Sequence, residues 1–273
     1  MKIILLVNRD IQSCLALNYL TDLFQNHLCR VYYTSRVGSH QHLPQPLQVL
    51  AALEQDLPFD LLFPALGGDR GGNLETFDRL ARHYGMVIEP LDRINKRENR
   101  AKVAEWAPDL IISIRHGTIL KRRVIQIPKR GVINLHSGIL PDYRGVMATF
   151  HALRNGEPKI GTTLHYITDN TIDTGPIIGK TSFEVHPEKS YFWHVLRIYK
   201  QGCNLVRETV NRLAAGPVAA AESRHEAGNY YSYPDEEALR DFQRQGRHLF
   251  HRSDLLDCYL PFLEEANRVD PHP

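Results

Sequence analysis

Short apolar runs alternate with longer helical patterns along most of this chain, and that alternation restricts the folds open to it. Chains of this kind build a sheet covered by helices. The segment Asp109–Ile114 is almost continuously apolar, as expected of a strand that is covered on both faces. We therefore predict an α/β fold with a mostly parallel, twisted sheet. The expected strands are Ile3–Val7, Arg30–Thr34, Leu61–Pro64, Met86–Ile88, Asp109–Ile114, Val132–Leu135, Thr162–Ile167 and Ile177–Glu184.

Capping residues and terminators define the expected helices. Asp10 and Ser190 are suitable N-caps, and Gly85 and Gly216 are typical of helix ends. The expected helices are Asp10–Phe24, Leu74–Tyr84, Arg97–Trp106, Met147–Arg154, Ser190–Leu213 and a charged helix from Asp235 to about Gln245.

The character of the sequence changes after Gly216, where it becomes aromatic and rich in turn residues. The part that follows is short for an independent domain. We expect one main domain over residues 1–216 and a helical C-terminal extension, residues 217–273, packed on it. The last residues, Asp270–Pro273, are expected to fray.

Composition favours a cytoplasmic protein with neither nucleic acid nor membrane as partner. The 33 basic and 31 acidic side chains leave a formal charge of +2, which indicates no strongly charged surface. The four cysteines form no Cys-x-x-Cys motif, which favours reduced, buried thiols. The apolar start Met1–Val7 is too short for a signal-peptide core or a membrane span. The oligomeric state stays open, with a homodimer as one option.

A polar, turn-rich stretch from Ile133 to Gly145 gives the strongest indication of a site. Asn134 and His136 are two residues apart, so their side chains project from the same face of a strand end. The Ser-Gly and Pro-Asp pairs that follow interrupt the strand and leave both side chains at the edge of the sheet, where α/β proteins bind ligands. The simpler alternative is an Asn and a His that only satisfy loop backbone groups.

A second turn-rich segment, Thr168–Pro176, contains Asp173. An amide, an imidazole and a carboxylate that meet in one place can manage a carbonyl oxygen and a proton in acyl transfer. An ordinary Asx turn explains the same segment, and Asp169 would serve that alternative as well as Asp173 does. From these residues alone, the role of the segment stays open.

The order of these motifs resembles the folate-dependent formyltransferase family. The likeness rests on Asn-x-His, then Ile-Leu-Pro-x-Tyr-Arg-Gly, and a downstream Asp-Thr-Gly. Members include glycinamide ribonucleotide transformylase, methionyl-tRNA formyltransferase and the N-formyltransferases of nucleotide sugars and of N-hydroxyornithine. The resemblance implies a Rossmann-like formyltransferase fold, with residues 1–216 as the catalytic domain. Supporting segments are Ala107–Ile112, Gly117–Leu120 and Gly161–His165.

The resemblance also implies the chemistry, which is transfer of the formyl group of 10-formyltetrahydrofolate to an amine, with release of tetrahydrofolate and no metal. Asn134, His136 and Asp173 would be the catalytic trio. The Asn134 amide and a protonated His136 would donate hydrogen bonds to the formyl oxygen. Asp173 would hold His136 in its useful protonation state and help to carry the proton. Two loops would hold the pteridine, with Thr118, Ile119, Leu120, Thr168, Asp169 and Thr171 as binding residues.

The amine acceptor is the least determined part of the prediction. Candidate residues for binding it are Arg9, Arg115, His116 and Arg144. Glycinamide ribonucleotide transformylases have a glycine-rich loop for phosphate after the first strand, whereas the loop Asn8–Ser13 has no glycine and its Asp10 would repel phosphate. The transfer-RNA enzymes carry a barrel domain and a basic surface. We expect neither here, because the chain has neither the length nor the charge for them.

We therefore expect an acceptor that is the amine of a small metabolite: an N-hydroxyornithine-like amine, an amino sugar nucleotide or a similar biosynthetic intermediate. The alternatives are a 10-formyltetrahydrofolate hydrolase, in which water replaces the amine, and glycinamide ribonucleotide formyltransferase. A NAD-binding protein would need Gly-x-Gly-x-x-Gly after Val7, and the sequence has none. The run Gly67–Asn73 is interpreted as a surface loop or as a flap over the acceptor site. Acceptor specificity is expected in residues 8–13, 35–48, 66–73 and 230–233.

Overall fold

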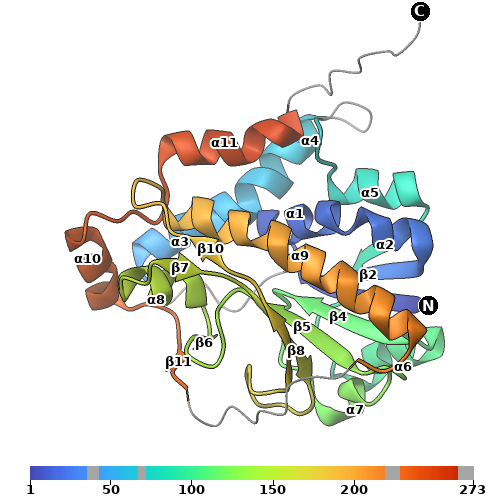
Figure 1. Cartoon of the computed structure of the whole chain (residues 1–273). Coiled ribbons are helices and arrows are strands. Elements are labelled where there is room, and N and C mark those ends of the chain that lie inside the picture. The colour runs from blue at the N-terminus through green and yellow to red at the C-terminus, as the bar shows by residue number, and fades with distance from the viewer. Residues whose placement is uncertain (36–42, 67–71, 219–227, 264–273) are drawn as a thin grey trace, which may run out of the picture.

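The computed structural model describes residues 1–35, 43–66, 72–218 and 228–263. Its main feature is a seven-stranded sheet with the order β3-β2-β1-β4-β5-β8-β9 (Figure 1). The strands from β3 to β5 in this order are parallel, whereas β8 is antiparallel to both β5 and β9. The mostly parallel α/β sheet is therefore confirmed. The strands are β1 (Lys2–Asn8), β2 (Leu28–Thr34), β3 (Val87–Pro90), β4 (Leu110–Ile114), β5 (Val132–His136), β8 (Thr163–Ile167) and β9 (Ile177–Lys180).

Side chains alternate along β1 between two hydrophobic cores. Ile3, Leu5 and Val7 pack in the larger core, whereas Ile4 and Leu6 pack in the smaller one. All five are fully buried, as expected of a strand with helices on both faces. The larger core includes side chains of α1 (Ile11–Tyr19), α2 (Thr21–Asn26), α5 (Phe77–Tyr84), α8 (Ala148–Arg154) and α9 (Tyr191–Ala215), and the smaller core includes side chains of α6 (Arg97–Trp106) and α7 (Arg122–Ile125).

Predicted caps begin and end several helices. The Asp10 carboxylate accepts a hydrogen bond from the Ser13 N–H at the start of α1, and Ser190 Oγ accepts one from the Trp193 N–H at the start of α9. Gly85 ends α5 in the left-handed conformation that glycine tolerates. The expected helix Asp10–Phe24 is divided in two, because α1 ends at Tyr19 and α2 begins at Thr21.

The expected strand at Leu61–Pro64 is wrong, because this segment is helical. It lies in a continuous helical stretch made of α3 (Gln45–Ala51), η2 (Ala52–Leu62) and α4 (Phe63–Ala65), in which η2 is a π-helix. A short apolar run does not by itself distinguish a strand from a buried helix. Pro58, which has no N–H to donate, lies inside the wide turns of η2.

The described residues after 216 pack on the rest of the protein. The short β11 (Tyr230–Tyr231) pairs in parallel with β6 (Arg144–Gly145), and β7 (Lys159–Ile160) pairs with β10 (Phe183–Glu184). Phe242 of α10 (Glu236–Arg244) and Phe262 of α11 (Arg252–Leu263) belong to the larger core. The boundary at residue 216 stays a prediction, and Asp270–Pro273 lie outside the described residues. No helix of the described ranges is long and apolar enough to cross a membrane.

Candidate active site

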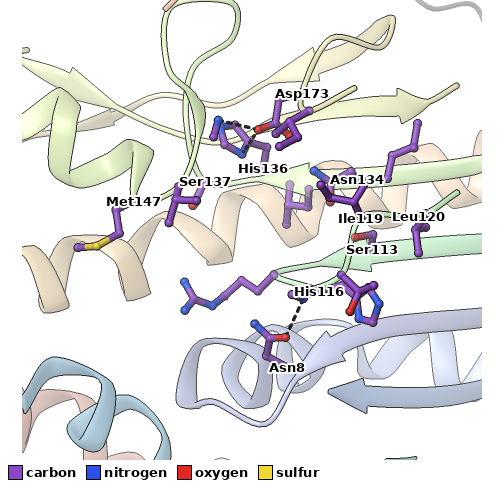
Figure 2. A pocket seen from close by; sticks show the side chains of 18 of the residues that line it. Asn8, Ser113, His116, Ile119, Leu120, Asn134, His136, Ser137, Met147 and Asp173 are labelled. Carbon is purple, nitrogen blue, oxygen red and sulfur yellow. Dashed lines mark hydrogen bonds and ion pairs between the residues drawn. The ribbon is translucent and has the colours of Figure 1, made fainter. Parts of the chain in front are cut away.

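A cavity of about 430 Å³ lies at the carboxyl ends of β4 and β5, which is the edge where parallel sheets bind ligands (Figure 2). One wall comes from the segment after β4, a second from the end of β5, and a third from the turn after β8. The structure brings the predicted catalytic trio and all the predicted folate-binding residues to this cavity. They are Asn134, His136, Asp173, Thr118, Ile119, Leu120, Thr168, Asp169 and Thr171.

The carboxylate of Asp173 lies between two histidines. Its Oδ2 is 3.4 Å from His136 Nδ1, and its Oδ1 is 3.4 Å from His165 Nε2. The Gly145 N–H also donates to Oδ2, at 2.9 Å. Burial would raise the pKa of Asp173, but the two histidines and the Gly145 N–H outweigh it and lower the pKa to about 2. Asp173 is therefore ionised at neutral pH, and its backbone is left-handed, with φ +55°.

The ring of His136 is held from both sides. Nε2 lies 2.6 Å from the Tyr143 carbonyl oxygen, which only accepts, so Nε2 carries a proton. Nδ1 faces the Asp173 carboxylate (dashed in Figure 2). Because both ring nitrogens face acceptors, the arrangement suits an imidazolium. The fit is tight, since a Cβ on Gly138 would lie 2.7 Å from Nε2.

His165 completes this network, and sequence reasoning missed it. Asn134 Nδ2 is 3.1 Å from His165 Nε2, and His165 Nδ1 is 2.9 Å from the Tyr166 carbonyl oxygen. The contact follows from the antiparallel register of β5 and β8, which places Asn134 opposite His165. His165 stands in the Gly-Thr-Thr-Leu-His run of the sequence, but nothing there predicts that β8 is the antiparallel neighbour of β5.

The structure separates the two acids of the turn after β8. Asp169 Oδ1 accepts hydrogen bonds from the Thr171 N–H, at 2.8 Å, and from the Thr171 hydroxyl, which is an Asx turn. Asp173 instead faces His136. The turn-forming alternative therefore applies to Asp169, and the carboxylate beside the imidazole is that of Asp173.

The segment after β4 presents apolar side chains to the cavity. Ile119 is 54% exposed although it lines the cavity, whereas Leu120 is buried and also belongs to the smaller core. Leu120 thus packs partly in the core, whereas Ile119 does not. Asn95 braces this segment, because its Nδ2 donates to the Ile119 carbonyl at 2.8 Å and its Oδ1 accepts from the Lys121 N–H at 2.9 Å.

Of the four predicted acceptor-binding residues, Arg115 and His116 line the cavity, and Arg9 and Arg144 are not among its lining residues. Arg9 pairs with Asp60 at 2.7 Å, and Arg144 Nη2 donates to the Gly228 carbonyl at 2.9 Å. Burial lowers the pKa of His116 to about 4, so this side chain is neutral at pH 7. Two parts of the loops expected to set acceptor specificity, residues 36–42 and 67–71, lie outside the described residues. The second of them contains most of the run Gly67–Asn73 that was interpreted as a surface loop or a flap.

Arg115 lies among carboxylates. Its Nε donates to Asp10 Oδ2 at 2.8 Å, and its Nη2 is 3.5 Å from Glu54 Oε2. Its backbone is left-handed, with φ +59°, which is uncommon for a residue other than glycine. Glu54 comes from η2 and lines the cavity. Sequence reasoning missed it, because no motif surrounds it.

These features define an α/β protein with an acid, an amide and two histidines at the carboxyl edge of its sheet. Residues 80–208 match the family described as formyl transferase. The methionyl-tRNA formyltransferase of Kosmotoga olearia is 30% identical over 152 residues, which cover 56% of this chain and 49% of that protein. That of Aromatoleum aromaticum is 27% identical, over 71% of this chain and 61% of that protein. The chain thus aligns with about half to three fifths of the length of these relatives.

Solved structures agree in fold. A sugar N-formyltransferase from Shewanella superposes with a TM-score of 0.57 and 16% identity, covering 91% of this chain and 89% of that one. Glycinamide ribonucleotide transformylase 1 from Symbiobacterium toebii gives a TM-score of 0.56 at 17% identity, covering 79% of this chain and 88% of that one. The chain therefore resembles formyltransferases in sequence over residues 80–208 and in fold over most of its length.

Proposed function

We propose that the chain transfers the formyl group of 10-formyltetrahydrofolate to the amine of a small metabolite. The observation that carries the proposal is the convergence of Asn134, His136 and Asp173 on one cavity at the carboxyl edge of the sheet. An amide donor, an imidazole and an ionised carboxylate are the groups that acyl transfer to an amine requires.

The cavity suits a folate. The exposed Ile119 and the neighbouring Leu120 give an apolar wall, and residues of the turn from Thr168 to Asp173 also line the cavity. When bound, 10-formyltetrahydrofolate supplies the formyl group. One solved relative, the sugar 3-N-formyltransferase WlaRD, was crystallised in the presence of 5-N-formyltetrahydrofolate, and it superposes with a TM-score of 0.54.

Asn134, His136 and Asp173 have separate roles in the proposed reaction. Asn134 Nδ2 donates to the formyl oxygen, and removal of one such donor typically costs about 3 kcal/mol of transition-state stabilisation. An imidazolium at His136 would stabilise the same oxygen through its charge, because its two ring nitrogens face Asp173 and the Tyr143 carbonyl. Asp173 orients His136 and helps to move the proton of the attacking amine toward the departing folate nitrogen. The amine forms the new N–C bond to the formyl carbon as the bond from that carbon to the folate nitrogen breaks.

The acceptor is proposed to be small and not a phosphate ester bound at α1. The carboxylate of Asp10 accepts from the Ser13 N–H at 2.8 Å and so fills the N-terminus of α1 with negative charge. This supports the earlier expectation that glycinamide ribonucleotide is a poor fit, because a phosphate would meet that carboxylate.

The experiment follows tetrahydrofolate release from 10-formyltetrahydrofolate, with and without a panel of amines. Amine-dependent release is expected. Amine-independent release would favour the hydrolase, and no release would contradict both. Asn134→Ala, His136→Ala and Asp173→Ala should each abolish turnover while circular dichroism shows a folded protein.

A further inference from the structure

Three charged side chains form a cluster beside the cavity and take no part in the proposed roles of Asn134, His136 and Asp173. Asp10 is fully buried, caps α1 and accepts from Arg115 Nε at 2.8 Å. Arg115 Nη2 lies 3.5 Å from Glu54 Oε2. Glu54 and Arg115 both line the cavity, and Glu54 is 7% exposed.

This cluster contains two carboxylates and one cation. Buried charges require partners, and Arg115 divides its guanidinium between Asp10 and Glu54. Gln12 adds a neutral N–H donor to Glu54 Oε1. Burial raises the pKa of Glu54 to about 7, because desolvation, with the charge of Asp10, outweighs the attraction of Arg115. The cluster therefore lacks one positive charge.

Two tyrosines and two leucines line the cavity together with Glu54. The hydroxyl-bearing side chains of Tyr191 and Tyr233 line the cavity and interact electrostatically with both Glu54 and Arg115. Leu47 and Leu50 of α3 line it as well and supply an apolar wall. Polar groups beside an apolar wall suit a short hydrocarbon chain that carries a polar head.

The cluster adjoins the catalytic trio on the side away from the proposed folate loop. Tyr199 lies against both Arg115 and Ser137, and Ser137 directly follows His136. In Figure 2, Ser137 and Met147 lie on one side of His136, whereas Ile119 and Leu120 lie on the other. An acceptor that reaches from Glu54 toward His136 would thus meet the formyl group from the side opposite the pteridine.

We infer that Glu54 binds a second, positively charged amino group of the acceptor, so that the substrate class is a short-chain molecule with two amines. This inference rests on the proposed function. One amine stays an ammonium and hydrogen-bonds the Glu54 carboxylate, which supplies the missing cation. The other, neutral amine reaches Asn134 and His136 and takes the formyl group. Diamines and diamino acids share this chemistry.

The test is calorimetric binding to the full chain in the presence of 5-formyltetrahydrofolate, which serves as an unreactive donor analogue. The probes are 1,4-diaminobutane, ornithine and 4-amino-1-butanol, in which a hydroxyl replaces the second ammonium. A thymidine-diphosphate amino sugar is the fourth probe. The two dibasic probes should bind about tenfold or more tightly than the amino alcohol.

Glu54→Gln should remove that preference. Asp241→Asn is the matched control: Asp241 is also an ion-paired carboxylate, 2.8 Å from Arg154 Nε, but it is not among the cavity residues. This variant should keep the preference. Comparing ornithine with 1,4-diaminobutane shows whether a carboxylate on the acceptor is recognised as well.

A second readout does not depend on a variant. At pH 6 the free protein holds Glu54 largely protonated, and an incoming ammonium expels that proton. The groups around Glu54 are Asp10, Arg115 and the tyrosines 191, 233 and 259, and the tyrosine pKa values are raised, so they do not titrate there. Titrations in buffers of different ionisation enthalpy should show greater proton release with 1,4-diaminobutane than with the amino alcohol.

Equal affinity for the amino alcohol, a preference for the amino sugar nucleotide, or a preference for dibasic probes that survives Glu54→Gln would each overturn the inference. If Glu54→Gln does not fold, two measurements on the wild type test the inference. They are the affinity for dibasic probes relative to the amino alcohol and the proton release on binding. Binding of diamine without 5-formyltetrahydrofolate binding would overturn the proposed function and leave this site standing. Binding of 5-formyltetrahydrofolate without a preference for diamines would overturn the Glu54 site and leave the proposed function standing.

Discussion

The backbone N–H of Gly145 donates a 2.9 Å hydrogen bond to Oδ2 of Asp173. Gly145 belongs to β6, which pairs with Tyr230–Tyr231 of β11, so a strand from the C-terminal part supports the group that holds the carboxylate. Gly145 has φ +95°, and a Cβ there would lie 2.1 Å from the Tyr231 carbonyl oxygen. The position of Asp173 thus depends on a contact that only glycine allows.

Gly145→Ala should separate β6 from β11 and displace the N–H from Asp173. We expect the turnover number to fall by about tenfold or more, and unfolding free energy to fall by about 1–3 kcal/mol. The matched control is Gly156→Ala, where φ is +78° but nothing lies within 4 Å of the added Cβ. The control should lose about 1 kcal/mol of stability and keep its turnover. Wild-type turnover in Gly145→Ala would show that this hydrogen bond does not position Asp173.

The lowered pKa of Asp173 predicts a pH-dependent contribution to stability. Its folded-state pKa is about 2, below the usual aspartate value of 3.8, so the contribution is present above pH 4 and is lost as pH falls through 2. The shift corresponds to about 2 kcal/mol. Urea unfolding of the wild type and of Asp173→Asn should therefore show a stability difference that shrinks by this amount between pH 5 and pH 2. A difference independent of pH would mean that Asp173 is not held by charged partners.

The tight fit of Gly138 against His136 gives a third prediction. A Cβ on Gly138 would lie 2.6 Å from Ala148 Cβ, 2.7 Å from His136 Nε2 and 2.7 Å from the Tyr143 carbonyl oxygen. Gly138→Ala should displace the His136 ring from its position between Tyr143 and Asp173 and lower kcat by about tenfold or more, at a stability cost of about 1–3 kcal/mol. Gly216→Ala, with nothing within 4 Å of its Cβ, is the control with unchanged kcat.

A substitution of Asn95 tests the proposed folate-binding role of the segment that carries Ile119. It braces the segment that carries Ile119 through hydrogen bonds of 2.8 and 2.9 Å. Asn95→Ala should raise KM for 10-formyltetrahydrofolate about tenfold and leave KM for the amine within about twofold, because the trio and Glu54 are untouched. A larger change in the amine KM than in the folate KM would contradict the assignment of this segment to the donor.

Much of the fold could be predicted because its signals are local. The apolar run Asp109–Ile114 indicates a buried strand, and it forms β4. Asp10 and Ser190 satisfy helix N–H groups through their own side chains, so the starts of α1 and α9 follow from sequence. The strand expected at Leu61–Pro64 was wrong because the helical state of this segment depends on the rest of the stretch from α3 to α4.

The site could be predicted only where residues are close in sequence or share a motif. Asn134 and His136 both line the cavity because residues two apart on one strand project from the same face. His165 and Glu54 reach it through long-range packing, from the antiparallel β8 and from η2. No local pattern encodes either contact. As turn residues Asp169 and Asp173 were equivalent, and only the family resemblance favoured Asp173. Their side-chain partners in the structure distinguish the turn residue from the neighbour of His136.

The central claim is that Asn134, His136 and Asp173 act together on a formyl group. It is tested most directly by single-turnover transfer of an isotopically labelled formyl group to an amine, at saturating concentrations of both substrates. Wild type should label the amine, whereas Asn134→Ala, His136→Gln and Asp173→Asn should each be slower by about 100-fold or more. Each variant should still bind 5-formyltetrahydrofolate. Transfer at a near-wild-type rate by any one of the three would contradict the account.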